Sequence, residues 1–202
     1  MAAAYSEKDP INPTQNIESW KLLIKLLVGS LTIFFMAGIM GFVVIQQQHI
    51  NLRYSRSLDV PASLWISTVA LLVVSYSLHR SISYAKREQL ETLKKVTLVG
   101  IAGALLFTLF QIIGMHDVYQ EHLHLKSSSI WNMSGISFVM ILSHGLHVAA
   151  GLIWLAIVAR NVFAKRYDHE YHLGLTLCAY YWHFLDFVWV VMFVVFLGSS
   201  IS

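Results

Sequence analysis

Five long apolar runs, separated by polar segments, are the feature that most constrains how this chain folds. They cover about residues 22–46, 61–79, 96–115, 136–159 and 174–197. A helix rises ~1.5 Å per residue, so each run approaches or exceeds the roughly 20 residues that cross ~30 Å of hydrocarbon. Barrel strands would be about 10 residues long with alternating polarity. The runs therefore predict an all-α, polytopic membrane helix bundle with five transmembrane helices.

Composition excludes a water-soluble domain of 202 residues, because 56% of the residues are hydrophobic, 12% are charged and the mean hydropathy is +0.61. Residues 1–21 are polar, contain two prolines and lack the short apolar core of a secretory signal. We interpret them as an N-terminal tail. Residues 22–202 are expected to form one five-helix transmembrane domain.

Lys and Arg are distributed unequally between the two predicted faces of the membrane. The tail and the loops at residues 80–95 and 160–173 carry eleven of them, and the other face carries three. The positive-inside rule then predicts a cytoplasmic N-terminus, and five spans predict an external C-terminus. Topology and anionic headgroups account for the pI of about 9.0, so no nucleic-acid partner is expected. The eleven cations are Lys8, Lys21, Lys25, Arg80, Lys86, Arg87, Lys94, Lys95, Arg160, Lys165 and Arg166.

The apolar runs contain a single acid, Asp186. A carboxylate at bilayer depth costs roughly 2.5–3.5 kcal/mol on insertion scales unless it is paired, so Asp186 has a structural or functional use. His183 precedes it by one helical turn, on the same face. His147 lies at a similar depth in the preceding run, so antiparallel neighbours would bring His147 level with Asp186. We interpret His144, His147, His183 and Asp186 as polar anchors between helices.

The same histidines leave a second interpretation open. His144 and His147 share one helix face and cannot ligate one haem from opposite sides. A haem or metal bridging either of them to His183 would make the chain a haem-binding membrane cytochrome or a quinol-interacting subunit. A proton relay is not expected, since a chain of titratable groups would need more than one acid. Cys178 is the only cysteine, so an internal disulfide is excluded.

A polar segment over about residues 116–135 is predicted to be an external loop. It could bind a transition metal, but a loop has no helical or strand spacing to fix the ligand geometry. We expect a solvated loop without a metal. The candidate ligands are His116, Asp117, Glu121, His122 and His124.

Four aromatic residues with polar edges lie deep in the last run, namely Tyr180, Tyr181, Trp182 and Trp189. A buried indole or phenol must find a hydrogen-bond partner. They indicate packing against another protein or against ordered lipid. The residues thus predict a helical subunit that packs in a larger membrane complex.

Two blocks of sequence resemble the signatures of subunit III of haem–copper terminal oxidases, the cytochrome c and quinol oxidases. The first is Ser143-His144-Gly145-Leu146-His147-Val148, followed by Gly151. The second is Tyr181-Trp182-His183-Phe184-Leu185-Asp186, followed by Val188-Trp189. The chain is similar to the short bacterial form with five spans, which implies a multi-pass protein of the bacterial inner membrane.

The resemblance implies a non-catalytic subunit that carries no haem or copper, since these belong to subunits I and II. In that family subunit III binds phospholipid, stabilises subunit I and sustains proton uptake in a proton-pumping enzyme of aerobic respiration that reduces oxygen to water. Such oxidases can join respiratory supercomplexes. Arg160 resembles an arginine that meets a lipid phosphate, and Trp182 and Trp189 are further candidates for lipid contact.

Three positions depart from the family pattern. Leu31, Gly114 and Thr176 stand where the family usually has acids in the membrane. Roles that need those carboxylates, such as proton collection, are therefore not expected of this chain. The departures indicate a divergent branch of the family.

Overall fold

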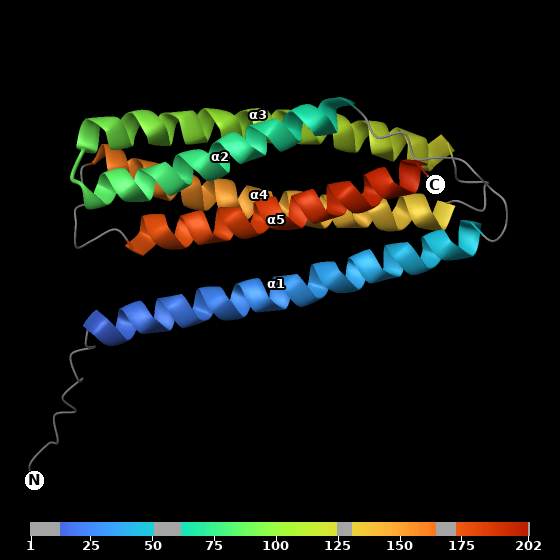
Figure 1. The fold of residues 1–202 in the computed structure, drawn as a ribbon, viewed down its shortest axis with the longest axis horizontal. Helices are drawn as coiled ribbons and strands as arrows, with labels where there is room; N and C mark the ends of the chain where they lie inside the picture. Colours follow the sequence, from blue (N-terminus) through green and yellow to red (C-terminus); the bar gives the residue numbers. More distant parts are fainter. Residues whose placement is uncertain (1–12, 51–61, 125–130, 165–172, 202) are drawn as a thin grey trace, which may run out of the picture.

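The computed structural model describes residues 13–50, 62–124, 131–164 and 173–201, and these residues form five long helices (Figure 1). No strand occurs in this part of the chain. The predicted all-helical membrane bundle is confirmed. The helices are α1 (Pro13–Ile50), α2 (Ala62–Lys86), α3 (Leu90–His124), α4 (Trp131–Phe163) and α5 (Leu173–Ile201).

Consecutive helices run in opposite directions, and the four helices α2 to α5 form a compact bundle (Figure 1). α2 packs against α3 and α5, and α4 packs against the same two helices from the other side. α1 lies outside this bundle, along α4 and α5. The signature residues of α4 and α5 therefore lie at the centre of the molecule.

Several helix ends differ from those predicted. α1 begins at Pro13, within the segment interpreted as a tail; proline suits the first position of a helix because its missing N–H has no partner there. The loop predicted for residues 116–135 is wrong at both ends, since α3 continues to His124 and α4 begins at Trp131. Residues 116–124 contain no glycine or proline that would end a helix, so the backbone continues after the apolar run stops.

Within the described residues, four helices are long and apolar enough to cross a membrane, with candidate spans at Glu18–Gln47, Leu90–Asp117, Gly135–Phe163 and Leu173–Gly198. α2 has sufficient length, 25 residues, but its many hydroxyls reduce its hydropathy. That α2 is the fifth span remains a prediction. It packs lengthwise against two of the apolar helices, α3 and α5, as a span would.

The hydroxyls of α2 are compatible with this prediction because several are satisfied inside the helix. Ser67 and Thr68 each donate a hydrogen bond of 2.8 Å to the Leu64 carbonyl. Ser81 donates one of 2.9 Å to the Ser77 carbonyl. A polar group bonded in this way can enter hydrocarbon at a reduced cost.

A tight turn at Glu88 sets α2 and α3 side by side. The Glu88 N–H bonds the Ala85 carbonyl and the Gln89 N–H bonds the Tyr84 carbonyl, both at 3.1 Å, which is the Schellman pattern. Glu88 has a φ of 55°, a left-handed conformation that costs a residue with a Cβ about 1–2 kcal/mol. The turn fixes the groove between the two helices that is described below.

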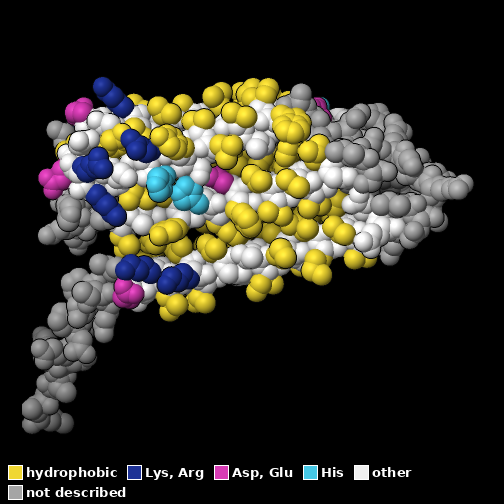
Figure 2. All heavy atoms as spheres, viewed as in Figure 1, with side chains coloured by type: hydrophobic (Ala, Val, Ile, Leu, Met, Phe, Trp, Pro, Cys, Tyr) yellow, Lys and Arg dark blue, Asp and Glu magenta, His cyan; other side chains and the backbone are white. Residues whose placement is uncertain are grey.

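Every Lys and Arg among the residues with described side chains lies at one end of the molecule, which we call the basic end (Figure 2). It is formed by the start of α1, the α2–α3 turn and the end of α4. Apolar side chains cover the surface beyond it. This distribution is the one that a membrane protein needs at a headgroup layer.

Candidate functional site

The two signature helices, α4 and α5, meet at Gly151. A Cβ at this position would lie 3.3 Å from Tyr181 Cε1 and 3.4 Å from Trp182 Cε2. The close approach allows the Trp182 indole to donate a hydrogen bond of 3.3 Å to the Gly151 carbonyl. Tyr181 donates one of 3.0 Å to the His147 carbonyl. Glycine suits this position because its backbone itself is the contact surface, and a Cβ would force the facing side chains to shift by a few tenths of an ångström.

The other side of α5 is tied to α2 by two polar contacts. Trp189 Nε1 donates a hydrogen bond of 3.0 Å to Thr68 Oγ1. Ser75 Oγ and His183 Nδ1 share a hydrogen bond of 2.5 Å. The hydroxyls that reduce the hydropathy of α2 thus supply partners for the polar edges of the α5 signature. Sequence reasoning missed this role, because nothing in the sequence shows which helix faces α5.

His144 lies in the core of the bundle and is fully buried. Its ring stacks on Trp189 with a centroid distance of 5.4 Å and an interplanar angle of 30°. The rings of Phe35 and Phe107 meet its edges at 6.1 and 6.4 Å. Neither ring nitrogen has a hydrogen-bond partner in the structure. This aromatic packing leaves no room for a haem plane beside His144, which weakens the cytochrome interpretation.

His147 does not make the contact with Asp186 that its depth suggested. Its Nδ1–H donates a hydrogen bond of 2.7 Å to the Ser143 carbonyl, one turn back in its own helix. The equal depth of two residues does not determine the rotation of their helices, and the rotation decides which side chains meet.

Asp186 is 6% exposed, and neither of its carboxyl oxygens has a hydrogen-bond partner in the structure. Its Oδ2 lies 4.0 Å from His183 Nδ1. The His183 side chain is 38% exposed. The ring of His79, an exposed residue of α2, lies 6.2 Å from the ring of His183. Exposure therefore increases from Asp186 in the interior, through His183, to His79 on the surface of the bundle. We call these three residues the imidazole face.

This face lies in the apolar part of the molecule. Counted along α2 and α5 at ~1.5 Å per residue, His79, His183 and Asp186 lie roughly 10, 15 and 20 Å from the helix ends at the basic end. Figure 2 shows imidazole atoms among apolar atoms, between the cationic end and the middle of the bundle, with a carboxylate beside them. Lipid can offer His183 and Asp186 no hydrogen bond at that depth, whereas His79 is the neighbour of Arg80 and lies nearer the headgroup layer.

Lipid contact by the two signature tryptophans is not supported by their positions. Trp182 and Trp189 are fully buried, with their indole N–H groups directed at neighbouring helices. Arg160 is exposed at the basic end of α4. The two tryptophans pack against helices of the same chain, whereas the sequence indicated another protein or ordered lipid.

The candidate metal ligands between residues 116 and 124 lie on α3. His116 Nδ1 and Asp117 Oδ1 are 3.8 Å apart, and both side chains are exposed. Glu121, His122 and His124 have side chains outside the described residues. Among the described side chains, no group of three or more His, Cys, Asp or Glu residues could hold a metal ion.

Three residues stand where the family usually has acids within the membrane, and their surroundings in the structure differ. Leu31 is buried in the main apolar core. A Cβ on Gly114 would lie 2.5 Å from Leu64 Cδ2, so the close packing of α3 on α2 leaves no room for an acid there. Thr176 lines a pocket between α1 and α5.

That pocket has a volume of about 500 Å³ and lies at the basic end. Lys21 and Lys25 of α1 line it, and Leu177 and Tyr180 of α5 form an apolar wall. Lys21 pairs with Glu18 at 2.8 Å, on the helix surface. Sequence reasoning missed this pocket, because it depends on α1 lying against α5.

A multi-pass helical membrane protein whose buried polar residues join its helices is the class that this fold and site define. Residues 26–199 match the family described as cytochrome c oxidase subunit III. The chain belongs to the cytochrome c oxidase subunit III family.

Curated relatives are similar over part of their length. The chain is 27% identical to the probable quinol oxidase subunit 3 of Staphylococcus saprophyticus over 128 residues. It is 28% identical to the proteins of the same description in Staphylococcus epidermidis and Staphylococcus aureus, also over 128 residues. Each alignment covers 63% of this chain and 62% of the relative, so the chain spans about three fifths of the relatives it matches.

Proposed function

We propose that this chain is the non-catalytic subunit III of a proton-pumping haem–copper respiratory oxidase, in which it stabilises subunit I. Haem and copper then reside in subunits I and II, and the complex reduces oxygen to water. Membership of the subunit III family supports the proposal. The descriptions of the relatives favour quinol as the electron donor of the complex.

The imidazole face is the observation that carries the proposal. His183, whose side chain is 38% exposed, lies roughly 15 Å from the basic end, at a depth where lipid can offer its second ring nitrogen no hydrogen bond. Polar residues within a membrane usually face another protein or a water-filled cavity. A partner subunit that covers this face and forms hydrogen bonds with the imidazoles would remove the free-energy cost of leaving ring nitrogens unbonded in lipid. Of the four residues predicted as anchors between helices, His183 has a hydrogen bond to another helix, through Ser75 of α2, and this bond supports the anchor role for that residue.

The orientation is part of the proposal. The basic end would face the cytoplasm of a bacterium, by the positive-inside rule, with the chain in the inner membrane. The N-terminus is then cytoplasmic and the C-terminus external.

The pocket between α1 and α5 is the proposed phospholipid site. Lys21 and Lys25 would attract an anionic headgroup, and the apolar wall would receive an acyl chain. Exposed Arg160 at the same end is a further candidate for headgroup contact.

Purification of the tagged chain in a mild detergent tests the proposal. We expect a larger, haem-bearing subunit to be isolated with it, and no haem band in a reduced-minus-oxidised spectrum of the separated chain. A stoichiometric haem in the chain alone would instead establish the cytochrome alternative, and the absence of any oxidase partner would refute the proposal.

His79→Leu sharpens this test. Replacing an exposed imidazole by an apolar side chain should not harm the isolated chain in lipid, whereas the complex loses a hydrogen bond. The amount of haem that stays with the tagged chain after extended washing should fall about fivefold. This factor corresponds to the free energy of one ordinary hydrogen bond. His116→Leu removes an exposed imidazole from the opposite end and serves as the matched control.

A further inference from the structure

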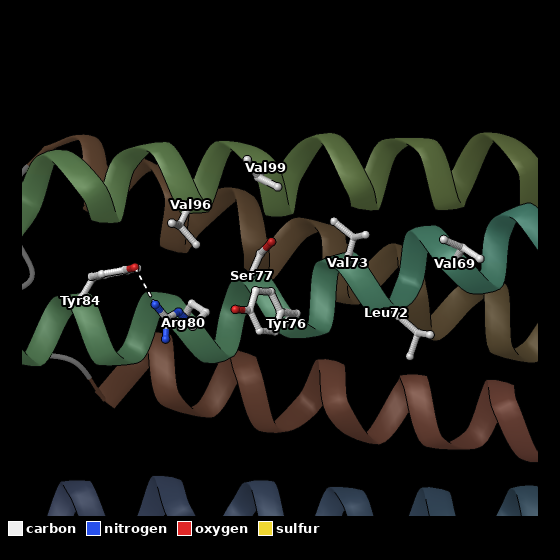
Figure 3. A pocket seen from close by; sticks show the side chains of 9 residues that line it. All are labelled: Val69, Leu72, Val73, Tyr76, Ser77, Arg80, Tyr84, Val96 and Val99. Atoms are coloured by element: carbon white, nitrogen blue, oxygen red, sulfur yellow. Dashed lines mark hydrogen bonds between the residues drawn. The ribbon is translucent and has the colours of Figure 1, made fainter.

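A groove of about 480 Å³ follows the surface between α2 and α3. The groove has apolar walls, and Figure 3 shows Val96 of α3 directed toward α2. The walls are formed by Val69 and Val73 of α2 and Val96 and Val99 of α3. Toward the basic end the lining becomes polar, with Tyr76, Arg80 and Tyr84. The groove is thus amphipathic along its length.

Arg80 provides the charge of this groove. Its Nη2 donates a hydrogen bond of 2.9 Å to the Tyr84 hydroxyl, and its Cζ lies 5.2 Å from the centre of the Tyr84 ring. The side chain is exposed, and no carboxylate of the described residues forms an ion pair with it. A guanidinium has five N–H donors, so Arg80 retains most of its capacity for an anion.

The length of the groove suits one leaflet of a bilayer. Val69 and Arg80 lie eleven residues apart on α2, which corresponds to roughly 16 Å along the helix. Half of the hydrocarbon core is about 15 Å thick. A cation at one end of an apolar groove of this length is complementary to a phosphate followed by an acyl chain.

We propose that the α2–α3 groove binds one anionic phospholipid from the leaflet at the basic end. Arg80 holds the phosphate, and Tyr84, which accepts the hydrogen bond from Arg80, has its own hydroxyl proton free for a phosphate oxygen. One acyl chain lies along the valines. The inference rests on the proposed function only in placing the chain in a membrane complex.

This site is separate from the other two surfaces. His79 and Arg80 are neighbours in sequence but point roughly 100° apart around α2, so the imidazole face is turned toward α5 and the groove toward α3. α1 packs against α4 and α5, so the pocket lined by Lys21 and Lys25 lies across the bundle from the groove.

Native mass spectrometry of the purified complex, with phosphatidylglycerol or phosphatidylethanolamine added, tests the inference. Arg80→Gln should weaken phosphatidylglycerol binding about tenfold, as the loss of one charge-assisted hydrogen bond predicts. Lys86→Gln removes a cation from the last turn of the same helix, outside the groove. This control should leave binding unchanged. Equal losses in the two variants would show general attraction to the basic end and overturn the site.

A second variant tests the apolar part of the groove. Val99 is 53% exposed, and Val99→Trp should fill the groove without disturbing the core. We expect both lipids to lose this binding site. Unchanged lipid binding would overturn the inference, as would a photo-crosslink from position 99 to a partner subunit. Haem recovery with the chain reports separately on the proposed function, so the two failures are distinguishable.

Discussion

α5 and α1 are both long apolar helices, but they are held in the molecule by different means. Half of the most apolar window of α5 is buried, against 11% of that of α1. α5 is bonded to α4 through Tyr181 and Trp182 and to α2 through His183 and Trp189. α1 contacts the bundle mainly through large apolar side chains such as Phe35 and Phe42.

The difference matters because lipid is itself apolar. Helices in a bilayer associate through close packing and hydrogen bonds, since moving an apolar side chain from lipid to protein gives little free energy. α5 has both kinds of contact and α1 mainly has packing. We therefore expect α5 to be the fixed centre of the fold, and α1 to depend more on its neighbours in the complex.

The largest effect should come from the contact between α4 and α5. Gly151→Leu places a side chain where a Cβ already lies 3.3–3.4 Å from three residues, so α5 must move away and lose its hydrogen bonds. We expect at least about 3 kcal/mol of destabilisation or no folded subunit, measured by SDS titration of the purified chain. Gly145→Leu is the control on the same helix, because no atom lies within 4 Å of the place a Cβ would occupy there. Equal losses in the two variants would refute the tight contact.

A smaller effect is expected where α1 meets the bundle. Phe35→Ala removes a ring that is 2% exposed and leaves a cavity. The cost in the same assay should lie below about 3 kcal/mol, the lower end for Phe→Ala in water-soluble cores, because lipid removes the hydrophobic transfer part of it. The adjacent residue gives a matched control, since Phe34 is 52% exposed and faces outward. Phe34→Ala should change stability little. A larger loss for Phe34 than for Phe35 would mean that α1 is rotated from its position in the structure.

The smallest effect is expected for a single hydrogen bond between α2 and α5. Thr68→Val keeps the side-chain shape but leaves the Trp189 indole without its acceptor. Such bonds contribute about 0.6 kcal/mol on average in a membrane protein, with a maximum near 1.7. Thr108→Val is the control, because Thr108 bonds only the Ala104 carbonyl of its own helix among the contacts described. If both variants lose the same amount of stability, the hydrogen bond between Thr68 and Trp189 does not contribute to the packing of α2 on α5.

The sequence was sufficient to predict the helical bundle, because the apolar runs coincide with the helices. It did not predict the helical polar ends at residues 13–21 and 116–124, since backbone hydrogen bonds continue where the apolar signal stops. Depth along a helix could be counted, so His147 and Asp186 were expected to pair. The rotation of α4 relative to α5 could not be inferred from the sequence. In the structure it leaves His147 bonded to the Ser143 carbonyl of its own helix.

The contacts of the signature were predictable only in part. Gly151 was recognisable by its position in the motif, and its close contact with α5 explains why a glycine stands there. Thr68 and Ser75 were not recognisable as hydrogen-bond partners of α5, because hydroxyls on a helix usually bond their own backbone. Their role depends on the packing of α2 against α5, a long-range contact that no local pattern contains.

The most direct test of the account concerns the imidazole face. Phe187 follows His183 by one turn on α5 and is 65% exposed, so a photoreactive phenylalanine analogue at this position probes what covers the face. In the intact complex, we predict crosslinks to the large haem-bearing subunit. Crosslinks to lipid alone, in a complex that retains its haem, would contradict the claim that a catalytic subunit covers His79 and His183.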